Sequence, residues 1–323
     1  VRRTVDVAFE GDTVIVGCNG FFSERMCEMA TRYGAKVVRV EKPWGEVFSL
    51  DEIKSALASL EANKPVKMVA LVHAETSTGI LQRLEEFPKI LKKPPDTLLL
   101  VDAVTSLGGH PVKVDEWGID ICYSGTQKCL SCPPGLAPIT FSPRAMKKIE
   151  GRAKKVQSLY LDMNMLGKYW ASERRYHHTA PISMNYALLE ALRIVREEGL
   201  ESRYERHRRN HLAMVAGIEA MGLKMFVEKP YRLWSLNTVR IPEGISDAKV
   251  RQRLLDEYNL EIGGGLGLLT GKIWRVGLMG YSSCETNVLY FLTALEQALR
   301  EQGFEVARGA GITAAKEVYS GAQ

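Results

Sequence analysis

The most constraining feature of the sequence is the regular alternation of short, β-rich apolar runs with helical patterns in its first half. This alternation is typical of βαβ units, which build a mainly parallel sheet because each crossover helix returns the chain to start the next strand in the same direction. The expected strands are the runs at 13–16, 36–40, 67–72, 97–101, 119–123 and 137–141. All are far shorter than the roughly 18 apolar residues of a membrane span. We therefore expect an α/β fold and no membrane partner.

Helix signals separate these strands and dominate the second half. The run Ser49 to Glu52 has the order of a capping box, in which the two side chains satisfy free N–H groups at a helix start. A long helix over 182–198 should end at Gly199, because glycine favours helix termination. We predict a large domain over 1–198 and a small α+β domain over 199–323. The latter has helices at 201–220, 247–258 and 285–301, strands at 224–227, 235–241 and 273–278, and a tail after 304 with too weak a pattern to assign.

Charge and cysteine usage exclude several classes of protein. The 43 basic and 38 acidic residues leave a net charge of +5, which a solvated surface explains without a nucleic-acid partner. The densest basic stretches, 147–155 and 203–209, are interpreted as exposed helix faces. Cys129 and Cys132 lack the second pair that a zinc site needs, so we expect no metal. No targeting signal is visible, and a cytoplasmic location is the default expectation.

Two charged residues follow buried strands. Asp102 ends the run Leu98–Val101, and ligands of open α/β sheets bind at the carboxyl ends of strands. For Asp102 alone, capping of the next turn is an equally good interpretation. Lys128 lies in a Ser-Gly-Thr-Gln-Lys turn after the next strand, where partial removal from water lowers the pKa of a lysine and makes it a nucleophile for a carbonyl. The alternative is an exposed loop lysine, although the small polar residues before Lys128 suit a phosphate.

A lysine and a carboxylate at neighbouring strand ends are what pyridoxal phosphate needs. The lysine forms the Schiff base, and the carboxylate keeps the pyridine nitrogen protonated. Over nearly its whole length the sequence resembles the alanine-glyoxylate and serine-pyruvate aminotransferases, class V enzymes of fold-type I. The resemblance rests on six segments in the same order, which are Val16–Gly20, His73–Gly79, Val101–Gly109, Tyr123–Lys128, Tyr176–Thr179 and Gly264–Arg275.

The resemblance implies roles for the residues at the two strand ends. Lys128 would carry the cofactor and act as the general base, and Asp102 would pair with the pyridinium nitrogen. Val104 would pack on the ring. Thr76 and Gln127 would hydrogen-bond the cofactor. The fold that the resemblance implies is the fold-type I transferase, with a mainly parallel large domain and a smaller C-terminal domain.

Two further residues are expected to face the cofactor and the substrate. In the family, an aromatic residue shortly after an Asn-Gly pair covers the ring, and Phe22 holds that position where animal relatives carry Trp; a plain core residue is the alternative. Arg275 lies in an apolar strand, where it is costly unless it meets an anion such as a substrate carboxylate or, alternatively, a structural ion-pair partner. The glycines at 263–267 lack dinucleotide-binding spacing and indicate close backbone approach to the site.

Tyr176 and Thr179 resemble residues that contact the cofactor phosphate of the neighbouring subunit, which implies a homodimer with shared sites. Family members also carry a Ser-Gly-x-Gly loop that holds the phosphate at a helix start, before the point where this sequence begins. We therefore expect an N-terminally incomplete chain that binds cofactor weakly. The alternative is a natural variant that holds the phosphate only through Gln127, Thr76, Tyr176 and Thr179.

The reaction predicted from the resemblance moves an amino group from alanine or serine to glyoxylate or pyruvate. Ureidoglycine-glyoxylate transfer is a close alternative, because it differs in only a few pocket side chains. A cysteine desulfurase is disfavoured, since those enzymes typically carry His where Gln127 precedes the lysine. The alternative from another class is a catalytically silent relative, which Lys128, Asp102 and Arg275 together oppose. The sequence does not fix the donor, because serine and alanine differ by one hydroxyl.

Overall fold

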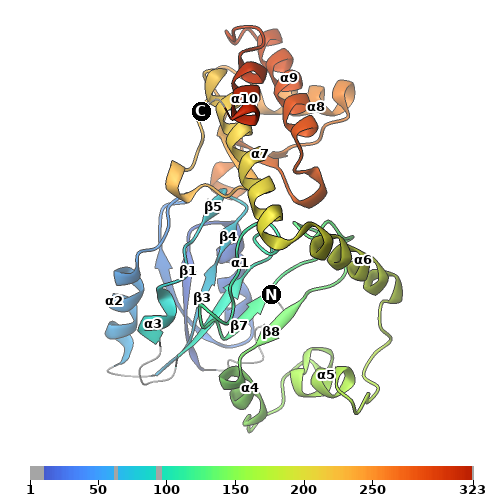
Figure 1. Cartoon of the computed structure of the whole chain (residues 1–323). Helices are drawn as coiled ribbons and strands as arrows, with labels where there is room; N and C mark the ends of the chain where they lie inside the picture. The colour runs from blue at the N-terminus through green and yellow to red at the C-terminus, as the bar shows by residue number, and fades with distance from the viewer. Residues whose placement is uncertain (1–10, 62–64, 92–96, 322–323) are drawn as a thin grey trace.

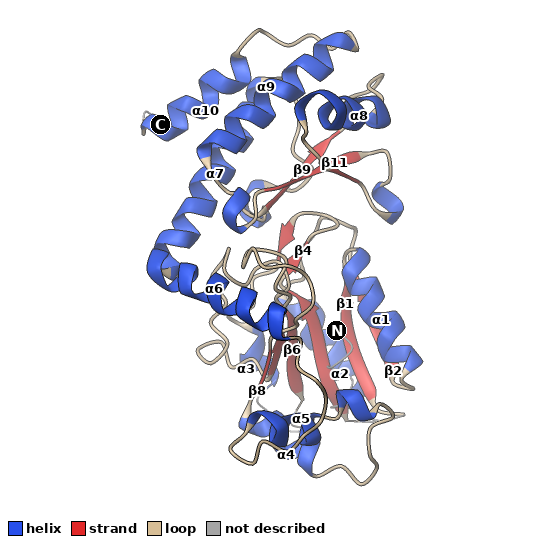
Figure 2. Cartoon of the chain, turned by 90° about the vertical axis from the view of Figure 1, so that its right-hand side faces the viewer, coloured by secondary structure: helices blue, strands red, loops and turns tan. Residues whose placement is uncertain are grey.

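Two sheets organise the chain in the computed structural model, which describes residues 11–61, 65–91 and 97–321. In Figure 1, the larger sheet and its helices form the lower part of the molecule, and α7 to α10 form the upper part. Figure 2 shows β9 and β11 of the smaller sheet above the larger one. No helix in the described ranges combines the length and apolar character needed to cross a membrane.

The larger sheet has six strands in the order β2-β1-β3-β6-β7-β8. The first five are parallel, and β8 pairs antiparallel with β7 at one edge. The mainly parallel α/β fold predicted from the sequence is confirmed. The strands are β1 (Thr13–Cys18), β2 (Lys36–Glu41), β3 (Val66–Val72), β6 (Leu98–Asp102), β7 (Ile121–Tyr123) and β8 (Ile139–Phe141).

Helices cover both faces of this sheet, which is why its strands read as continuous apolar runs. Successive side chains of β1 point to opposite faces. Val14 and Val16 pack in one cluster with Met26, while Ile15 packs in another with Ile53. The helices are α1 (Phe21–Arg32), α2 (Leu50–Glu61), α3 (Phe87–Leu91) and α4 (Pro143–Glu150).

The capping box predicted at the start of α2 is present. Ser49 N donates to Glu52 Oε2 at 2.8 Å, and Glu52 N donates to Ser49 Oγ at 3.3 Å. A short two-stranded ribbon that the sequence patterns did not predict, β4 (Ala74–Glu75) with β5 (Ile80–Leu81), follows β3. Its chain reversal at Gly79 uses a φ of 80°, a conformation that favours glycine.

The two parts are joined through α6 (Ile182–Glu198) and α7 (Leu200–Ala220), with Gly199 at a φ of 81° between them. Figures 1 and 2 show α7 running from this bend into the upper part. The predicted domain division between 198 and 199 falls at this turn and stays a prediction. The aromatic segment over 159–178 contains α5 (Met163–Trp170), whose first turn is capped by Asp162.

The basic stretch 203–209 was predicted to be an exposed helix face, and for two residues this is wrong. Arg203 and His207 are buried, with exposed fractions of 3% and 0%. They lie on the side of α7 that packs against the loops of the larger part, where Arg203 donates to the Gly108 carbonyl at 3.0 Å. A run of charged residues is consistent with an exposed helix, but it does not show which side of that helix packs against another segment.

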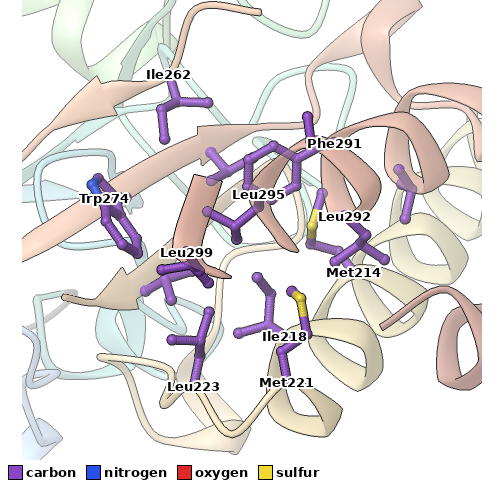
Figure 3. Close-up of a cluster of buried hydrophobic side chains, with 14 of the residues drawn as sticks. Met214, Ile218, Met221, Leu223, Ile262, Trp274, Phe291, Leu292, Leu295 and Leu299 are labelled. Carbon is purple, nitrogen blue, oxygen red and sulfur yellow. The ribbon is translucent and has the colours of Figure 1, made fainter. Parts of the chain in front are cut away.

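The smaller sheet is antiparallel, with the order β10-β11-β9. Its strands β9 (Leu236–Arg240), β10 (Gly263–Gly264) and β11 (Ile273–Gly277) pack under α8 (Asp247–Tyr258) and α9 (Glu285–Glu301). Figure 3 shows the core between them, which contains Trp274 of β11, Met214 and Ile218 of α7 and leucines of α9.

Two sequence interpretations of this part differ from the structure. The tail after 304 contains α10 (Ala310–Ser320), which packs on α7 where a side chain at Gly217 would lie 2.8 Å from the Gly311 carbonyl. The strand predicted at 224–227 is a single bridge, in which Met225 pairs with Val239 of β9. Its backbone makes two hydrogen bonds with β9 and then turns away before a short 3-10 helix at 229–231.

Candidate active site

Most of the predicted site residues lie at or just after the ends of four parallel strands, and these are Phe22, Thr76, Asp102, Val104, Gln127 and Lys128. The strand order reverses between β1 and β3, because the chain passes from β1 to β2 on one side and from β3 to β6 on the other. Ligands of open α/β sheets bind at such a point. Strand ends are level here, since Val72 of β3 pairs with Asp102 of β6, and Asp102 with Tyr123 of β7. In Figure 2, β4, which follows β3, lies on the side of the sheet that faces β9 and β11.

Asp102 is buried, and both of its carboxylate oxygens have donors. Tyr123 Oη donates to Oδ2 at 2.5 Å, and Val104 N donates to Oδ1 at 2.8 Å. The turn-capping role considered from the sequence is therefore real, but it uses only part of the acceptor capacity of a carboxylate. Burial raises the pKa of Asp102, and the hydrogen bonds from Tyr123 and Val104 and the charge of Lys128 offset part of the rise.

Lys128 is half-buried in the turn after β7. Burial lowers the pKa of its amine, and the positive charge of Arg275 lowers it further, while Asp102 acts in the opposite direction. Within the described ranges, its side chain makes no hydrogen bond or ion pair. A partly desolvated amine without a partner suits a nucleophile better than a structural lysine.

Arg275 of β11 reaches this site from the smaller sheet. Its Nε donates to the Gly264 carbonyl at 2.7 Å, and its Nη1 contacts the Thr76 carbonyl at 3.4 Å. Gly263 pairs with Arg275 across the strands, and a side chain at Gly263 would lie 3.1 Å from Nη2, which explains the close approach expected of these glycines. Among described residues Arg275 has no ion-pair partner, although the charge of Glu75 is near enough to raise its pKa against the effect of burial.

Glu75 is a site residue to which sequence reasoning gave no role. It is fully buried, and its Oε2 accepts hydrogen bonds from Phe22 N at 3.1 Å and Ser23 N at 3.0 Å, at the start of α1. Its Oε1 accepts from Ser77 N at 3.1 Å and Ser77 Oγ at 2.6 Å. Glu75 thereby ties the segment after β3 to the residue expected to cover the cofactor. The only signal in the sequence that could have indicated this role is an acidic residue that stands between an apolar strand and small polar residues.

The remaining predicted residues have different surroundings. Thr76 is buried, Val104 is half-buried and Gln127 is exposed beside Lys128. Phe22 is half-buried, belongs to none of the core clusters of the described chain, and meets the ring of Phe21 edge-to-face at 5.6 Å. This favours a surface role over the plain core role considered for it.

Tyr176 and Thr179 are not brought to this site in the single chain. They lie in the exposed loop between α5 and α6, where the Tyr176 hydroxyl is 3.4 Å from Thr179 Oγ1. Tyr176 is 75% exposed.

This fold and this set of side chains define a pyridoxal phosphate-dependent transaminase, and comparisons with known proteins agree. Residues 3–284 match the class-V aminotransferase family, and the chain belongs to that family. It is 42% identical to (S)-ureidoglycine–glyoxylate transaminase of Bacillus subtilis (strain 168) over 329 residues, covering 96% of this chain and 78% of that protein. It is 40% identical to alanine–glyoxylate aminotransferase of Rattus norvegicus over 294 residues, covering 90% and 70%.

Solved structures give the same result. Alanine–glyoxylate aminotransferase from Nostoc sp. superposes with a TM-score of 0.89 at 50% identity, covering 93% of this chain and 78% of that one. Ureidoglycine-glyoxylate aminotransferase from Bacillus subtilis gives 0.95 at 41% identity, covering 99% and 81%. The cofactor expected from the sequence is thus supported by family and fold. The donor set also fits it, with an amine for the aldehyde and a buried carboxylate for the ring nitrogen.

Proposed function

We propose that this transaminase moves an amino group from alanine or serine to glyoxylate or pyruvate, with Lys128 and Asp102 as catalytic residues. Bound pyridoxal phosphate supplies an electron-accepting ring conjugated to the carbon that exchanges the amino group. The observation that carries the proposal is the half-buried Lys128 near buried Asp102 at the ends of adjacent strands, where the Lys128 side chain has no hydrogen-bond or ion-pair partner among the residues that the structure describes. Asp102 would hold a proton on the ring nitrogen, through acceptor capacity that Tyr123 and Val104 leave free.

Lys128 would bind the cofactor aldehyde and later move a proton at the substrate Cα. The lowered pKa of its amine increases the uncharged fraction, which is the form that attacks a carbonyl and accepts a proton. Thr76, Gln127, Val104 and Phe22 would hold the cofactor around this position.

Arg275 would bind the substrate carboxylate. Its contacts with the carbonyls of Gly264 and Thr76 use two of its five N–H donors and fix the guanidinium plane. The remaining donors can hold a carboxylate by two parallel hydrogen bonds, and the α-carboxylate is shared by every amino acid and 2-oxo acid proposed here.

The surroundings of Arg275 support a donor with a small side chain. A side chain at Gly267 would lie 2.9 Å from Trp44 Cη2 and 3.9 Å from Phe21 Cδ2, so two aromatic rings crowd the loop that follows Gly264. Such rings present mostly apolar surface, which suits a methyl group better than a ureido group. Ureidoglycine is the second candidate donor, favoured by the similarity to the Bacillus subtilis enzyme.

The first experiment is the absorbance spectrum of the purified chain with pyridoxal phosphate, recorded alone, after alanine and after glyoxylate. We expect a visible band that disappears with alanine and returns with glyoxylate. The Lys128→Ala variant should lose the band, and Lys113→Ala, an exposed lysine paired with Glu116, should keep it. Retention of the band and of turnover in Lys128→Ala would contradict the assignment. Turnover with alanine, serine and ureidoglycine at equal concentration then ranks the donors.

We further propose that two copies of the chain form a homodimer through α5, α6 and the loop between them. Ten of the sixteen large apolar side chains that are exposed in the described chain lie between residues 159 and 194, including Trp170, Ile182, Tyr186 and Leu189, which are 62–69% exposed. An apolar patch of this extent is typical of a protein interface. In such a dimer Tyr176 and Thr179 of each copy would serve the cofactor of the other.

Mixed dimers test the shared site. Lys128→Ala and the double variant Tyr176→Phe with Thr179→Val should each be impaired alone. Co-refolded together, they should recover activity, because one site of each mixed dimer then combines an intact Lys128 with an intact Tyr176 and Thr179. No recovery, in mixtures shown by sedimentation to contain dimers, would contradict sharing.

A further inference from the structure

A buried arginine joins the two segments that carry Asp102 and Lys128. Arg203 lies in the first turn of α7 and is 3% exposed. Its Nε donates to the Gly108 carbonyl at 3.0 Å, and its Nη2 donates to the Cys129 carbonyl at 2.6 Å. Gly108 belongs to the loop that follows Asp102, and Cys129 is the neighbour of Lys128. One planar guanidinium therefore sets the spacing of the two segments.

Glu198, the last residue of α6, balances the charge of Arg203. Its Oε2 accepts from Arg203 Nη1 at 2.5 Å, and its carboxylate also accepts from Arg206 Nε at 2.5 Å and Nη2 at 3.0 Å. Burial raises the pKa of Glu198, but the hydrogen bonds from Arg206 and Arg203 outweigh this effect and lower the pKa below its usual value. Removing one partner of a buried pair leaves an uncompensated charge, so a variant has to keep the pair or remove both members.

Arg206 shares this carboxylate but contacts a different segment. Its Nη1 donates to the carbonyls of Gly280 at 2.8 Å and Ser283 at 2.6 Å, at the two ends of a short turn that precedes α9. None of its hydrogen bonds within the described chain reaches the turn that carries Lys128. Arg206 meets this turn only through that segment, because Tyr281 N donates to Ser131 Oγ at 2.7 Å. Arg206 is therefore a control that shares the helix and the ion-pair partner of Arg203 but binds neither the Gly108 nor the Cys129 carbonyl.

The position of Lys128 follows from the backbone of its turn. Its side chain has no partner in the described ranges that could hold it in place. The turn is closed by Ser131 N, which donates to the Lys128 carbonyl at 2.9 Å. Ser131 has a φ of 58°, a left-handed conformation that is costly for a residue other than glycine. A turn with this cost persists only if its surroundings hold it, and Arg203 binds the carbonyl in its middle.

We propose that Arg203 is a positioning residue for amino transfer, which holds Lys128 Nζ at its working distance from Asp102 and the cofactor by binding the Gly108 and Cys129 carbonyls together. The proposal rests on the role proposed above for Lys128. Arg203 touches neither Lys128 Nζ nor Asp102, so it acts through the backbone alone. A displacement of about 1 Å at a reacting group can lower the rate roughly 100-fold. The two hydrogen bonds that fix the backbone next to Lys128 are therefore expected to affect the rate of amino transfer.

Three variants test the proposal, and these are Arg203→Lys, Arg203→Met combined with Glu198→Gln, and Arg206→Met. A lysine at 203 keeps a charge beside Glu198, but its single amine lacks the planar fork that serves both carbonyls. In the cofactor-free chain, the rate at which acetic anhydride modifies Lys128, followed against pH by peptide mass spectrometry, reports the pKa of this amine. In the loaded enzyme, steady-state kinetics with alanine gives kcat and KM.

We expect both Arg203 variants to move the pH midpoint of Lys128 modification upward by about half a unit or more, because a released turn exposes the amine to water. We expect kcat to fall by about tenfold or more, with KM for alanine changed by less than about threefold, since Arg275 is untouched. Arg206→Met should keep the parent midpoint.

The proposal is overturned if both Arg203 variants keep the parent midpoint and a kcat within about twofold of the parent, or if Arg206→Met changes both quantities equally. Arg203→Lys keeps the test valid if the double variant does not fold. Failure of the proposed function has a different signature. In that case, borohydride reduction of the loaded parent chain does not link the cofactor to Lys128.

Discussion

Mild acid is predicted to destabilise the cofactor-free chain through three buried histidines. Burial lowers the pKa of His73, His207 and His211 to about 4 each. Each neutral ring has a hydrogen-bond partner inside the protein. His207 Nε2 accepts from Gly280 N at 2.9 Å, His211 Nδ1 lies 2.6 Å from Asn237 Oδ1, and His73 Nδ1 lies 2.9 Å from Ser106 Oγ.

The sign of the effect follows from linkage. A histidine whose pKa is lower in the folded state contributes its full stabilisation above an unfolded-state pKa of about 6.5, and the contribution is lost as the pH falls toward the folded pKa of about 4. At pH 5 this amounts to about 2 kcal/mol for each ring and about 6 kcal/mol for three. Domains are stable by only about 5–15 kcal/mol, so we expect a large part of the stability to be lost between pH 7 and pH 5.

The assay compares urea unfolding of the parent and His207→Gln at pH 7.5 and pH 5, followed by tryptophan fluorescence. Glutamine places an amide oxygen near the position of Nε2, so it can still accept from Gly280 N, but it does not titrate. We expect the loss of stability on acidification to be smaller by about 2 kcal/mol in His207→Gln than in the parent.

Equal losses in the parent and His207→Gln, to within about 0.5 kcal/mol, would refute this reasoning. The comparison between variants isolates the effect of the histidine because both chains carry the same carboxylates. His110 should act in the same direction, since burial, together with the nearby charges of other histidines, lowers its pKa well below the usual value.

Three other predictions concern the site. Arg275→Ala should raise the apparent KM for alanine by about 10- to 100-fold with cofactor affinity retained, and unchanged steady-state kinetics would exclude a carboxylate-binding role. Tyr123→Phe removes a hydrogen bond that lowers the pKa of Asp102, so the pH midpoint of cofactor binding, followed by absorbance, should move upward; a midpoint at or below that of the parent speaks against the pairing. Glu75→Gln leaves a buried N–H without an acceptor and should cost about 1–3 kcal/mol in urea unfolding, whereas exposed Glu85→Gln should cost almost nothing.

The sequence alone was sufficient to predict the large sheet and the place of Asp102 and Lys128. Fully buried strands are continuous apolar runs, and parallel strands end at the same edge of the sheet. A carboxylate at the end of one strand and a lysine in the turn after the next strand are therefore expected at the same edge. The register confirms this, because Asp102 pairs with Tyr123 and Lys128 follows five residues later. The sequence near the end of each strand is thus enough to predict which side chains lie at this edge of the sheet.

Features that depend on contacts between distant segments were missed. The helix α10 has a weak apolar pattern, and its packing on α7 relies on the close approach of Gly217 and Gly311, which no periodicity reveals. The segment at 224–227 alternates like a strand, but only Met225 pairs with β9 before the chain turns away. The sequence pattern predicts which face of a helix or strand is apolar, but only the packing of the folded chain determines which segment that face contacts.

The residues that hold the site together also needed the tertiary structure. From the sequence, Glu75 belonged to a matching segment without a role, and Arg203 belonged to a basic stretch interpreted as exposed. The fold makes each of them a buried charge with partners 52 to 95 positions away in the chain. The sequence therefore determined which groups are candidates for the chemistry, because that depends on residue type at the end of a strand. Only the tertiary structure decided what positions those groups, because a buried charge is defined by the distant segments that satisfy it.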